Sequence, residues 1–316
     1  MTTTTRYPPV PPEQDGVTAW YPATLDAAAY TVALDQFLDM AGGPVASVPA
    51  PDQPILRGEV GAPGLPAGFD QLLTEVGRRL TDGPGFALVK GFPVDGAARW
   101  STQVFASLMS GFGKLLAQDV HGDLLHLVRT TGLGDHRQYG SKGSGELLFH
   151  TDQAAAPVDQ LPGVLGLLAL QRAASGGHTR LVSGHTLLNE LRTRDAALAA
   201  SLCAPLPFAR DDDGVSSSDP VEAAAVVIGR GGRARIRFNR YFIETGARRV
   251  GVELDSRVSA ALDEVDDLFD TRPLDLELLL EPGDALVADN SVILHNRTAY
   301  QDDDHHLRCL VRAWAR

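Results

Sequence analysis

Two stretches of the sequence, His-Thr-Asp at 150–152 and His-Gly-Asp at 121–123, could each hold a metal ion. On a β-strand, residues i and i+2 project from the same face, so both side chains of such a pair can reach one ion. An apolar Leu-Leu-Phe run precedes His150 and Asp152, which predicts a buried strand that ends at this pair. In the other pair Gly122 favours a turn between two strands. We therefore take His150 and Asp152 as the candidate ligands.

A third ligand is available in His295, which ends the nearly continuous apolar run at 284–295. A histidine at the end of a buried strand lies at the rim of a sheet or barrel, where a metal can keep open coordination positions. Two histidines and one carboxylate that leave three adjacent positions open suit a non-haem Fe(II) that binds oxygen and a co-substrate. The same ligands with one water would suit a zinc hydrolase or a cupin-like metal isomerase. The ligands alone leave this choice open.

Two arginines, Arg308 and Arg312, lie four residues apart in an apolar, strand-like segment near the C-terminus. Arginine is rarely buried in such a strand without a partner, and its planar guanidinium binds a carboxylate through two parallel hydrogen bonds. Residues i and i+4 of a strand face the same way. The pair therefore predicts one or two anionic small molecules beside the metal. The alternative is internal ion pairs with Asp284 or Asp289.

The elements that must position these residues follow from hydrophobic periodicity. Helical spacing predicts helices over 25–42, 69–83, 98–113, 186–202 and 256–270. Strand-like runs cover 85–93, 163–173, 176–184, a hairpin at 224–239 about Gly231-Gly232, and the two segments that carry His295 and the arginine pair. Because helices cluster in the first third and strands dominate the rest, the pattern predicts an α+β protein, with helices packed outside a sheet or barrel.

A glycine-rich segment at 130–146 leads directly to the first candidate ligand. It contains five glycines, and a long loop of this kind inside a compact domain is often functional. We expect it to act as a lid, with His136 and Tyr139 as candidate substrate contacts.

Composition excludes several classes of protein. The chain has 316 residues and a formal net charge of −12, which disfavours binding to nucleic acid or to anionic membranes. Its two cysteines cannot make a disulfide framework or a four-thiolate metal site. No apolar stretch reaches the roughly 18 residues of a membrane span, and the Pro-rich start at 1–18 lacks the apolar region of a signal peptide. We expect a cytoplasmic protein with a small-molecule substrate, and a homo-oligomer is compatible with the sequence.

Six segments in the same order as in a known family span about residues 80–316: GFALVKGFP, LLFHTDQ, GGHTRLVSG, RFNRYFIETGARR, EPGDALVADNSVILHNRTAYQDD and HLRCLVRAW. The chain resembles the TauD/TfdA family of Fe(II)- and 2-oxoglutarate-dependent dioxygenases, including its clavaminate-synthase-like branch. The resemblance implies a double-stranded β-helix (jelly-roll) core with surrounding helices and the metal at one mouth of the barrel. It also implies one catalytic domain over 19–316, after an N-terminal arm at 1–18.

The resemblance assigns roles to individual residues. The three candidate ligands would bind Fe(II), Arg308 would bind the distal carboxylate of 2-oxoglutarate, and the hydroxyl of Thr179 would assist it. Arg312 aligns with an arginine that contacts an anionic substrate group in some members. His178 departs from the pattern, because an acidic residue usually follows the Gly-Gly turn. Related halogenases need a small residue where this chain has Asp152, so the carboxylate points to hydroxylation or another oxidation.

The implied reaction converts 2-oxoglutarate and O2 to succinate and CO2 while an unactivated C–H bond of a small polar molecule is oxidised. An amino acid or a derivative in specialised metabolism is the leading substrate class. The zinc hydrolase or cupin-like isomerase remains the alternative, although it gives no reason for Arg308, Arg312 and Thr179 to converge. A non-catalytic binding protein is a second alternative, which the presence of all three ligands disfavours.

Overall fold

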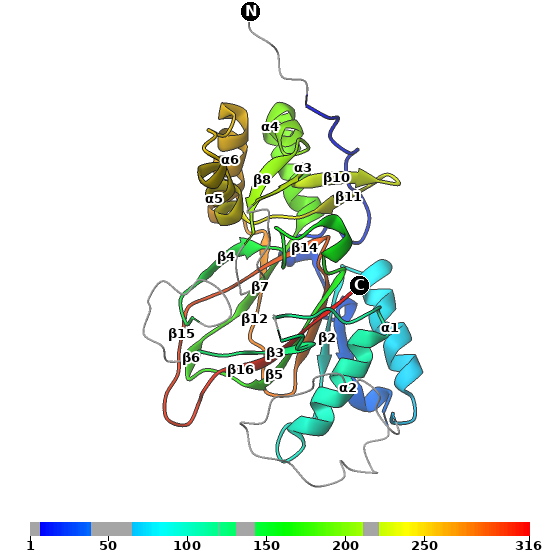
Figure 1. The fold of residues 1–316 in the computed structure, drawn as a ribbon. Helices are drawn as coiled ribbons and strands as arrows, with labels where there is room; N and C mark the ends of the chain where they lie inside the picture. Colours follow the sequence, from blue (N-terminus) through cyan, green and yellow to red (C-terminus); the bar gives the residue numbers. More distant parts are fainter. Residues whose placement is uncertain (1–6, 39–64, 120, 131–142, 211–220) are drawn as a thin grey trace, which may run out of the picture.

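Two sheets, antiparallel except for the pairing of their first two strands in the chain, form the centre of the computed structural model, which describes residues 7–38, 65–119, 121–130, 143–210 and 221–316 (Figure 1). The larger sheet has the strand order β1 (Thr31–Ala33), β2 (Phe86–Lys90), β13 (Ala285–Asp289), β5 (Val164–Gln171), β16 (Cys309–Ala315) and β3 (Leu125–Val128). The smaller sheet has the order β12 (Asp275–Leu278), β7 (Thr179–Ser183), β14 (Ile293–Arg297) and β4 (Leu147–His150). Short pairings of β15 (Tyr300–Gln301) with β6 (Ser175–Gly176) extend this region.

Alternation along the strands divides the core into two layers on either side of the larger sheet. Val311 and Ala313 of β16 pack on the face covered by helices, whereas Leu310 and Trp314 pack on the opposite face with Leu181 of the smaller sheet. Since side chains alternate with a period of two, Arg312 shares its face with Leu310 and Trp314. The strand pattern therefore turns Arg312 toward the space between the sheets.

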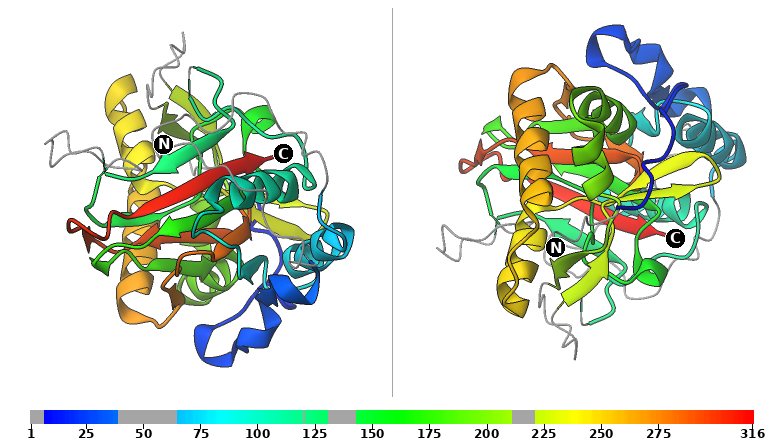
Figure 2. Two further views of the ribbon diagram at one scale, coloured as in Figure 1. Left: turned by 90° about the horizontal axis from the view of Figure 1, so that it is seen from below. Right: turned by 90° about the horizontal axis from the view of Figure 1, so that it is seen from above.

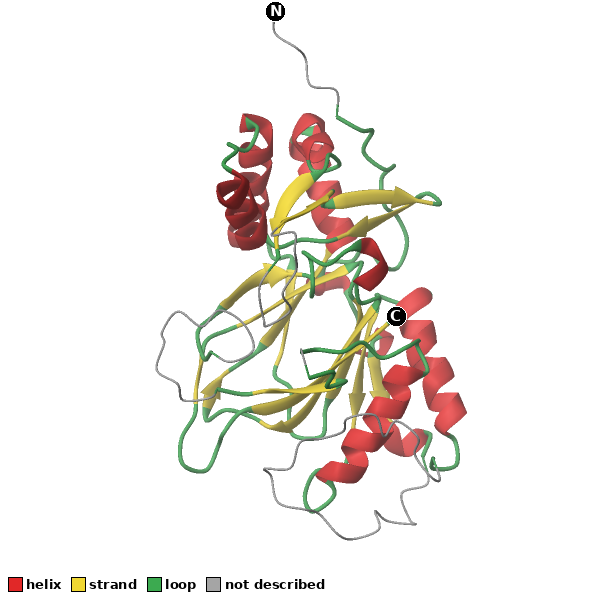
Figure 3. Cartoon of the chain, in the orientation of Figure 1, coloured by secondary structure: helices red, strands yellow, loops and turns green. Residues whose placement is uncertain are grey.

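Two helices of the first third cover the outer face of the larger sheet, as predicted. Helix α1 (Phe69–Thr81) packs on β2 and β13, and α2 (Ala98–Ser110) packs on β16 and β5 (Figure 3). In α1 the buried residues Leu72, Val76 and Leu80 recur every four positions, which places them on one helical face.

The predicted helix at 25–42 is wrong. Its described part contains short 3₁₀ turns at Ala27–Ala29 and Leu34–Gln36, with the strand β1 between them. Strand β1 pairs in parallel with β2, and Tyr30 accepts a hydrogen bond from the amide of Leu88. Pairing with an open sheet edge outweighs the helical periodicity here, because a short helix gains little without tertiary packing. Residues 39–42 lie outside the described residues.

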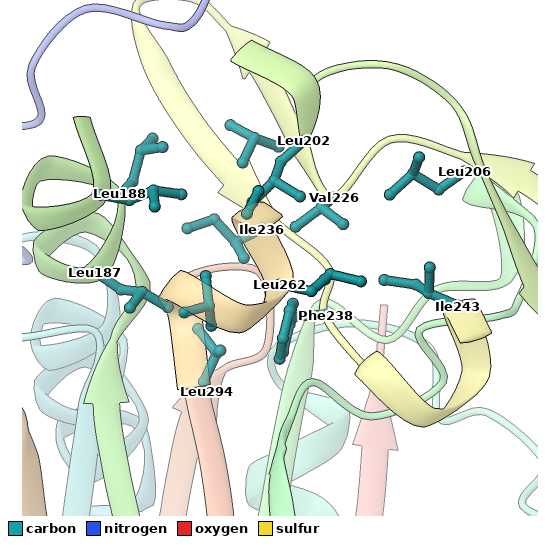
Figure 4. Packing of buried hydrophobic residues seen from close by; sticks show 14 of the residues in the cluster. Leu187, Leu188, Leu202, Leu206, Val226, Ile236, Phe238, Ile243, Leu262 and Leu294 are labelled. Carbon is teal, nitrogen blue, oxygen red and sulfur yellow. The ribbon is translucent and has the colours of Figure 1, made fainter. Parts of the chain in front are cut away.

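A second helical group lies at the other end of the molecule. It contains α3 (Gly184–Arg194), α4 (Ala196–Ser201), α5 (Arg240–Val250) and α6 (Ser256–Thr271), with the strand pairs β8 (Leu206–Ala209)/β9 (Val221–Ala224) and β10 (Val227–Arg230)/β11 (Arg233–Ile236). Figure 2 shows the α1–α2 pair and the α5–α6 pair on opposite sides of the molecule. Figure 4 shows the apolar core of this group, in which Leu188, Ile236, Phe238 and Leu262 are buried together.

The local sequence explains most boundaries in this group. The predicted helix 186–202 divides at Asp195, whose side chain accepts hydrogen bonds from the amides of Ala197 and Leu198 and so starts α4. The predicted hairpin is confirmed, with Gly231 and Gly232 both at positive φ in its turn. Helix α6 is also confirmed.

Helix α5 has no counterpart among the predicted elements. Its signals were an Asn239 N-cap, whose side chain accepts from the amide of Phe242, and a C-terminal glycine at 251.

The described part of the Pro-rich arm lies against α3 and the β10/β11 hairpin. The side-chain oxygen of Gln14 accepts a hydrogen bond from the backbone amide of Ala234, and the backbone amide of Gln14 donates to the side chain of Asn189. The hydroxyl of Thr18 lies 2.8 Å from Nδ1 of His185. The arm is thus bound to the domain by side-chain contacts instead of by a strand. No helix within the described ranges is long and apolar enough to cross a membrane.

Candidate metal centre

The predicted ligands converge because β4 and β14 pair in a register that places His150 opposite His295. The two imidazole ring centroids are 4.4 Å apart. Asp152 Oδ1 lies 3.4 Å from His150 Nε2 and 3.5 Å from His295 Nε2. One donor atom from each residue therefore falls within 4.8 Å of the others, a separation at which all three can bind one ion. Among the described residues, no other group of histidine, cysteine or acidic side chains comes together in this way.

The competing His-Gly-Asp stretch forms a turn, as predicted. Asp119 accepts hydrogen bonds from the amides of His121 and Asp123, and Gly122 adopts a φ of 80°. His121 is exposed, and it does not share the pocket of the other histidines.

The segment that carries Asp152 is tied to the protein on both sides. The amide of Thr151 donates to the Phe238 carbonyl at 2.8 Å, and the Phe238 amide donates to the Thr151 hydroxyl at 3.0 Å. Asn290 accepts from the amide of Asp152 and donates to its carbonyl. The next residue, Gln153, has a φ of 55°, the one positive value that a non-glycine residue adopts in the described chain. Such local strain persists where the surroundings over-determine the backbone, and here it adjoins a metal ligand.

The two oxygens of the Asp152 carboxylate have different partners. Oδ1 faces both histidines, whereas Oδ2 accepts a hydrogen bond of 2.7 Å from the indole Nε1–H of Trp314. Oδ2 also lies 3.7 Å from Nη1 of Arg312, whose guanidinium stacks 4.1 Å from the Trp314 ring. One oxygen is therefore free to bind a metal while the other is held by the protein.

Electrostatics keep Asp152 and His295 in metal-binding protonation states. Burial alone would raise the pKa of Asp152, but Arg312 and the hydrogen bonds to the two histidines bring that pKa well below its usual value. Burial, followed by the charge of His150, lowers the pKa of His295. At neutral pH the carboxylate is thus ionised and His295 is neutral. Nδ1 of His150 lies 2.8 Å from the carbonyl oxygen of Leu148, which favours the tautomer with its lone pair on Nε2.

The metal ligands lie in a pocket of about 540 Å³, measured with its open mouth. Three further residues with predicted roles, Thr179, Arg308 and Arg312, line the same pocket. Arg308 is 5% exposed, and its Nη1 has no hydrogen-bond partner. Arg312 donates from Nε to Gln118 at 2.7 Å.

The alternative of ion pairs with Asp284 or Asp289 is wrong, although Arg312 does lie 3.7 Å from Asp152. Asp284 pairs instead with Lys90 Nζ at 2.8 Å, and Asp289 accepts hydrogen bonds from the amide and hydroxyl of Ser291.

Some site residues were not predicted. Asn296 and Arg297, which directly follow His295 in the chain, line the pocket. Trp314 donates a hydrogen bond to the carboxylate of the metal ligand Asp152. Arg297 lies two residues after a predicted ligand on the same strand, which is a signal the sequence contained. His136 and Tyr139 lie outside the described residues, as does most of the predicted lid, so neither prediction is tested.

Comparison with known proteins resolves which chemistry this ligand set serves. A family model described as "Taurine catabolism dioxygenase TauD, TfdA family" matches residues 56–314. The chain belongs to the TauD/TfdA family. It is accordingly an Fe(II)- and 2-oxoglutarate-dependent dioxygenase, and the zinc hydrolase or isomerase alternative finds no support.

Relatives and solved structures agree with this assignment. The FR-33289 synthase of Streptomyces rubellomurinus is 25% identical over 250 residues, which cover 77% of this chain and 72% of that protein. The human gamma-butyrobetaine dioxygenase is 29% identical over 176 residues, 54% of this chain and 44% of that enzyme.

Two solved structures share the fold. One is an asparagine oxygenase in complex with Fe(II), 2S,3S-3-hydroxyasparagine and succinate, with a TM-score of 0.64 and 23% identity over 78% of this chain and 79% of that one. The other is the non-heme iron oxygenase OrfP with Fe and alpha-ketoglutaric acid, with a TM-score of 0.62 and 19% identity over 78% and 79% of the two chains. The enzyme therefore has a TauD-like oxygenase fold of mixed helices and sheets.

Proposed function

We propose that the enzyme hydroxylates an unactivated C–H bond of a free amino acid or a close derivative. One observation carries the proposal: a His-Asp-His cluster, with Asp152 and His295 buried and His150 half-buried, shares one pocket with Arg308 and Arg312. A metal site that must also hold an anionic co-substrate and an anionic substrate needs this combination, whereas a hydrolytic zinc site does not.

The chemistry of the donor set fits Fe(II). His150, Asp152 and His295 would hold the metal, and bound iron supplies the activation of O2 that side chains cannot perform. Trp314 would keep Asp152 bound through a single oxygen, because the indole N–H occupies the other one. The protein's own contribution is to orient the ligands and to exclude water from a buried pocket.

Arg308 and Thr179 are the proposed binding groups for 2-oxoglutarate. Arg308 is buried and has an unpartnered guanidinium nitrogen, which suits a carboxylate that accepts two parallel hydrogen bonds. Thr179 is also buried and lies in the same pocket lining, so its hydroxyl can donate to that carboxylate.

The substrate class rests on Arg312 and on the related proteins. Arg312 lies beside Asp152 at the metal end of the pocket, where it can bind the carboxylate of an amino acid while the side chain of that substrate lies over the metal. Two of the solved structures contain hydroxylated amino acids: a hydroxyasparagine in asparagine oxygenase and (3S)-hydroxy-L-Arg in OrfP. We extend the substrate class, but neither specific amino acid, to this enzyme. Because Asp152 is a carboxylate, we assign hydroxylation or another oxidation instead of halogenation.

We also infer that the two sheets are the layers of a double-stranded β-helix, and that residues 19–316 make one catalytic domain after the arm at 1–18. A shared core supports this, since Leu165 and Trp314 of the larger sheet pack with Leu181 and Ile293 of the smaller one. The cytoplasmic location, the absence of nucleic-acid and membrane partners, and a possible homo-oligomer stay predictions.

A panel of free amino acids tests the proposal. Purified protein would be supplied with Fe(II), 2-oxoglutarate and O2, and each product would be examined by mass spectrometry alongside succinate release. We expect one class of amino acid to gain an oxygen atom and to stimulate succinate formation. A product formed with Zn(II) and without 2-oxoglutarate would overturn the assignment. The His150→Ala variant should show neither activity, and His121→Ala is the matched control.

A further inference from the structure

A second buried arginine, Arg297, lines the pocket next to the proposed co-substrate groups. It follows His295 by two residues on β14, so both side chains project from the same face of the strand. In the pairing of β14 with β7, Arg297 lies directly opposite Thr179. The pairing of β14 with β7 thus places Arg297 and Thr179 two residues along the strand from the metal ligand His295.

The contacts of Arg297 satisfy only part of its guanidinium. Nη2 donates to the carbonyl of Gly145, and the group lies 4.8 Å from the centre of the Tyr300 ring. Its Nε and Nη1 are buried and have no hydrogen-bond partner, and the residue is 4% exposed. Arg308 lies 5.2 Å from the same ring and also has an unpartnered nitrogen. Tyr300 is therefore shared by two buried cations.

Within the described part of the chain neither cation forms an ion pair, whereas other arginines such as Arg180 and Arg240 pair with acidic residues. Asp302 acts on Arg308 only from beyond ion-pair distance. Burial, followed by the charge of Arg297, lowers the pKa of Arg308 to about 10, so the two groups interact. Burying two like charges without an anion is costly, and a bound carboxylate offsets that cost.

We propose that Arg297 is a second cationic group of the co-substrate subsite, which acts with Arg308 and Thr179 on the distal carboxylate of 2-oxoglutarate. The proposal rests on the function proposed above. A carboxylate offers about four acceptor positions, so a bidentate Arg308 leaves room for Thr179 and for one N–H of Arg297. The consequence is selectivity, because a pocket with two cations should strongly prefer 2-oxo acids that carry a distal negative charge.

The position of Arg297 favours the co-substrate over the substrate as the source of this carboxylate. Arg297 shares Tyr300 with Arg308 and lies opposite Thr179. Arg312, the proposed substrate contact, instead lies against Trp314 and Asp152 and donates to Gln118. The two ends of the pocket therefore present separate cations to separate anions.

A binding cycle with two ligands and one substitution tests the proposal. Isothermal titration calorimetry would measure 2-oxoglutarate and 2-oxopentanoate, which has the same chain length without the distal carboxylate, binding to anaerobic Fe(II)-loaded protein without amino-acid substrate. We expect Arg297→Gln to weaken 2-oxoglutarate about tenfold, as for loss of one charge-assisted contact, and to leave 2-oxopentanoate unchanged or tighter. Arg172→Gln, at an exposed arginine, removes the same charge and should change neither affinity.

Different outcomes separate the possible errors. Equal weakening of both acids would mean that Arg297 only supports the backbone at Gly145, and it would overturn the proposal. An affinity for 2-oxoglutarate that the substitution leaves unchanged would overturn it as well. If Arg297→Gln does not fold, Arg297→Lys should still lower the preference for 2-oxoglutarate, because lysine retains charge without the planar fork. Wild-type protein that fails to bind 2-oxoglutarate would instead reject the proposed function.

Discussion

The two ends of the pocket are prepared in opposite ways. At the metal end the ligands have protein partners: His150 contacts the Leu148 carbonyl, and Asp152 is held by Asn290 and Trp314. At the arginine end, Arg297 and Arg308 keep buried nitrogens without partners. The ligand side chains must already point toward the metal position before the metal binds, so neighbouring protein groups hold them in that orientation. A carboxylate brings its own acceptor oxygens, so unsatisfied donors are what it requires.

The two ends of the pocket also carry different charged groups. The metal end contains the ionised carboxylate of Asp152 beside Arg312, whose charge helps to hold that pKa well below its usual value, whereas the arginine end contains two buried cations. A metal ion at the first end would bind the carboxylate of Asp152, and an anion at the second would neutralise Arg297 and Arg308. The pocket is therefore complementary to a metal and a dicarboxylate placed in one order along its length.

Removal of a metal ligand should have the largest effect on this arrangement. His150→Ala, Asp152→Ala or His295→Ala should abolish both Fe(II) binding and turnover while the fold persists, because the ligands contribute little to core packing. Metal content and circular dichroism would measure the two properties separately. Full activity in His150→Ala, or its loss in the His121→Ala control, would show that the wrong histidine–aspartate pair has been chosen. Asp152→Gly should also lose hydroxylation.

Loss of the main anion contact should come next. Arg308→Gln should raise the KM for 2-oxoglutarate by one to two orders of magnitude, since a charge-assisted bond in a buried site contributes about 1.5–3 kcal/mol. Steady-state succinate formation would measure it. If Arg312→Gln raised this KM and Arg308→Gln did not, the roles of the two arginines would be exchanged.

Substitution of Trp314, which orients the carboxylate of the metal ligand Asp152, should have a smaller effect. Trp314→Phe keeps the ring but removes the hydrogen bond to Asp152 Oδ2, and loss of such a supporting contact typically lowers metal affinity by about tenfold or more. A metal titration with Fe(II) or Mn(II) would measure it. Trp20→Phe is the matched control, because it removes an indole hydrogen bond to the Pro84 carbonyl away from the pocket. Equal metal affinity in the two variants would contradict the positioning role.

The smallest effect should come from the neutral group at the arginine end. Thr179→Val removes one uncharged hydrogen bond and should raise the KM for 2-oxoglutarate several-fold, consistent with about 1 kcal/mol. Metal affinity should be unchanged, which distinguishes this variant from Trp314→Phe. A Thr179→Val variant as impaired as Arg308→Gln would mean that the hydroxyl has a larger part in co-substrate binding than the guanidinium.

The sequence by itself determined the chemistry of the site and many of its elements. The His-x-Asp spacing after an apolar run pointed to His150 and Asp152, although the strand ends at His150 and Asp152 lies in the turn that follows. The end of an apolar run identified His295, and arginines in an apolar strand indicated an anion. Helical periodicity likewise predicted the helices now labelled α1, α2 and α6. These features are local, so the spacing of residue types is enough to specify them.

Only the tertiary structure decided which distant groups share a contact. The edge pairing of β1 with β2 replaced a predicted helix at 25–42, since the hydrogen bonds of a sheet depend on a partner 57 positions further along, as at Thr31 and Leu88. The β14–β7 register set Arg297 against Thr179, and the packing between the sheets brought Trp314 to Asp152. Such contacts depend on register and on the relative positions of two sheets. Neither is encoded in the spacing of nearby residues, so the unpartnered nitrogens of Arg297 became visible only in three dimensions.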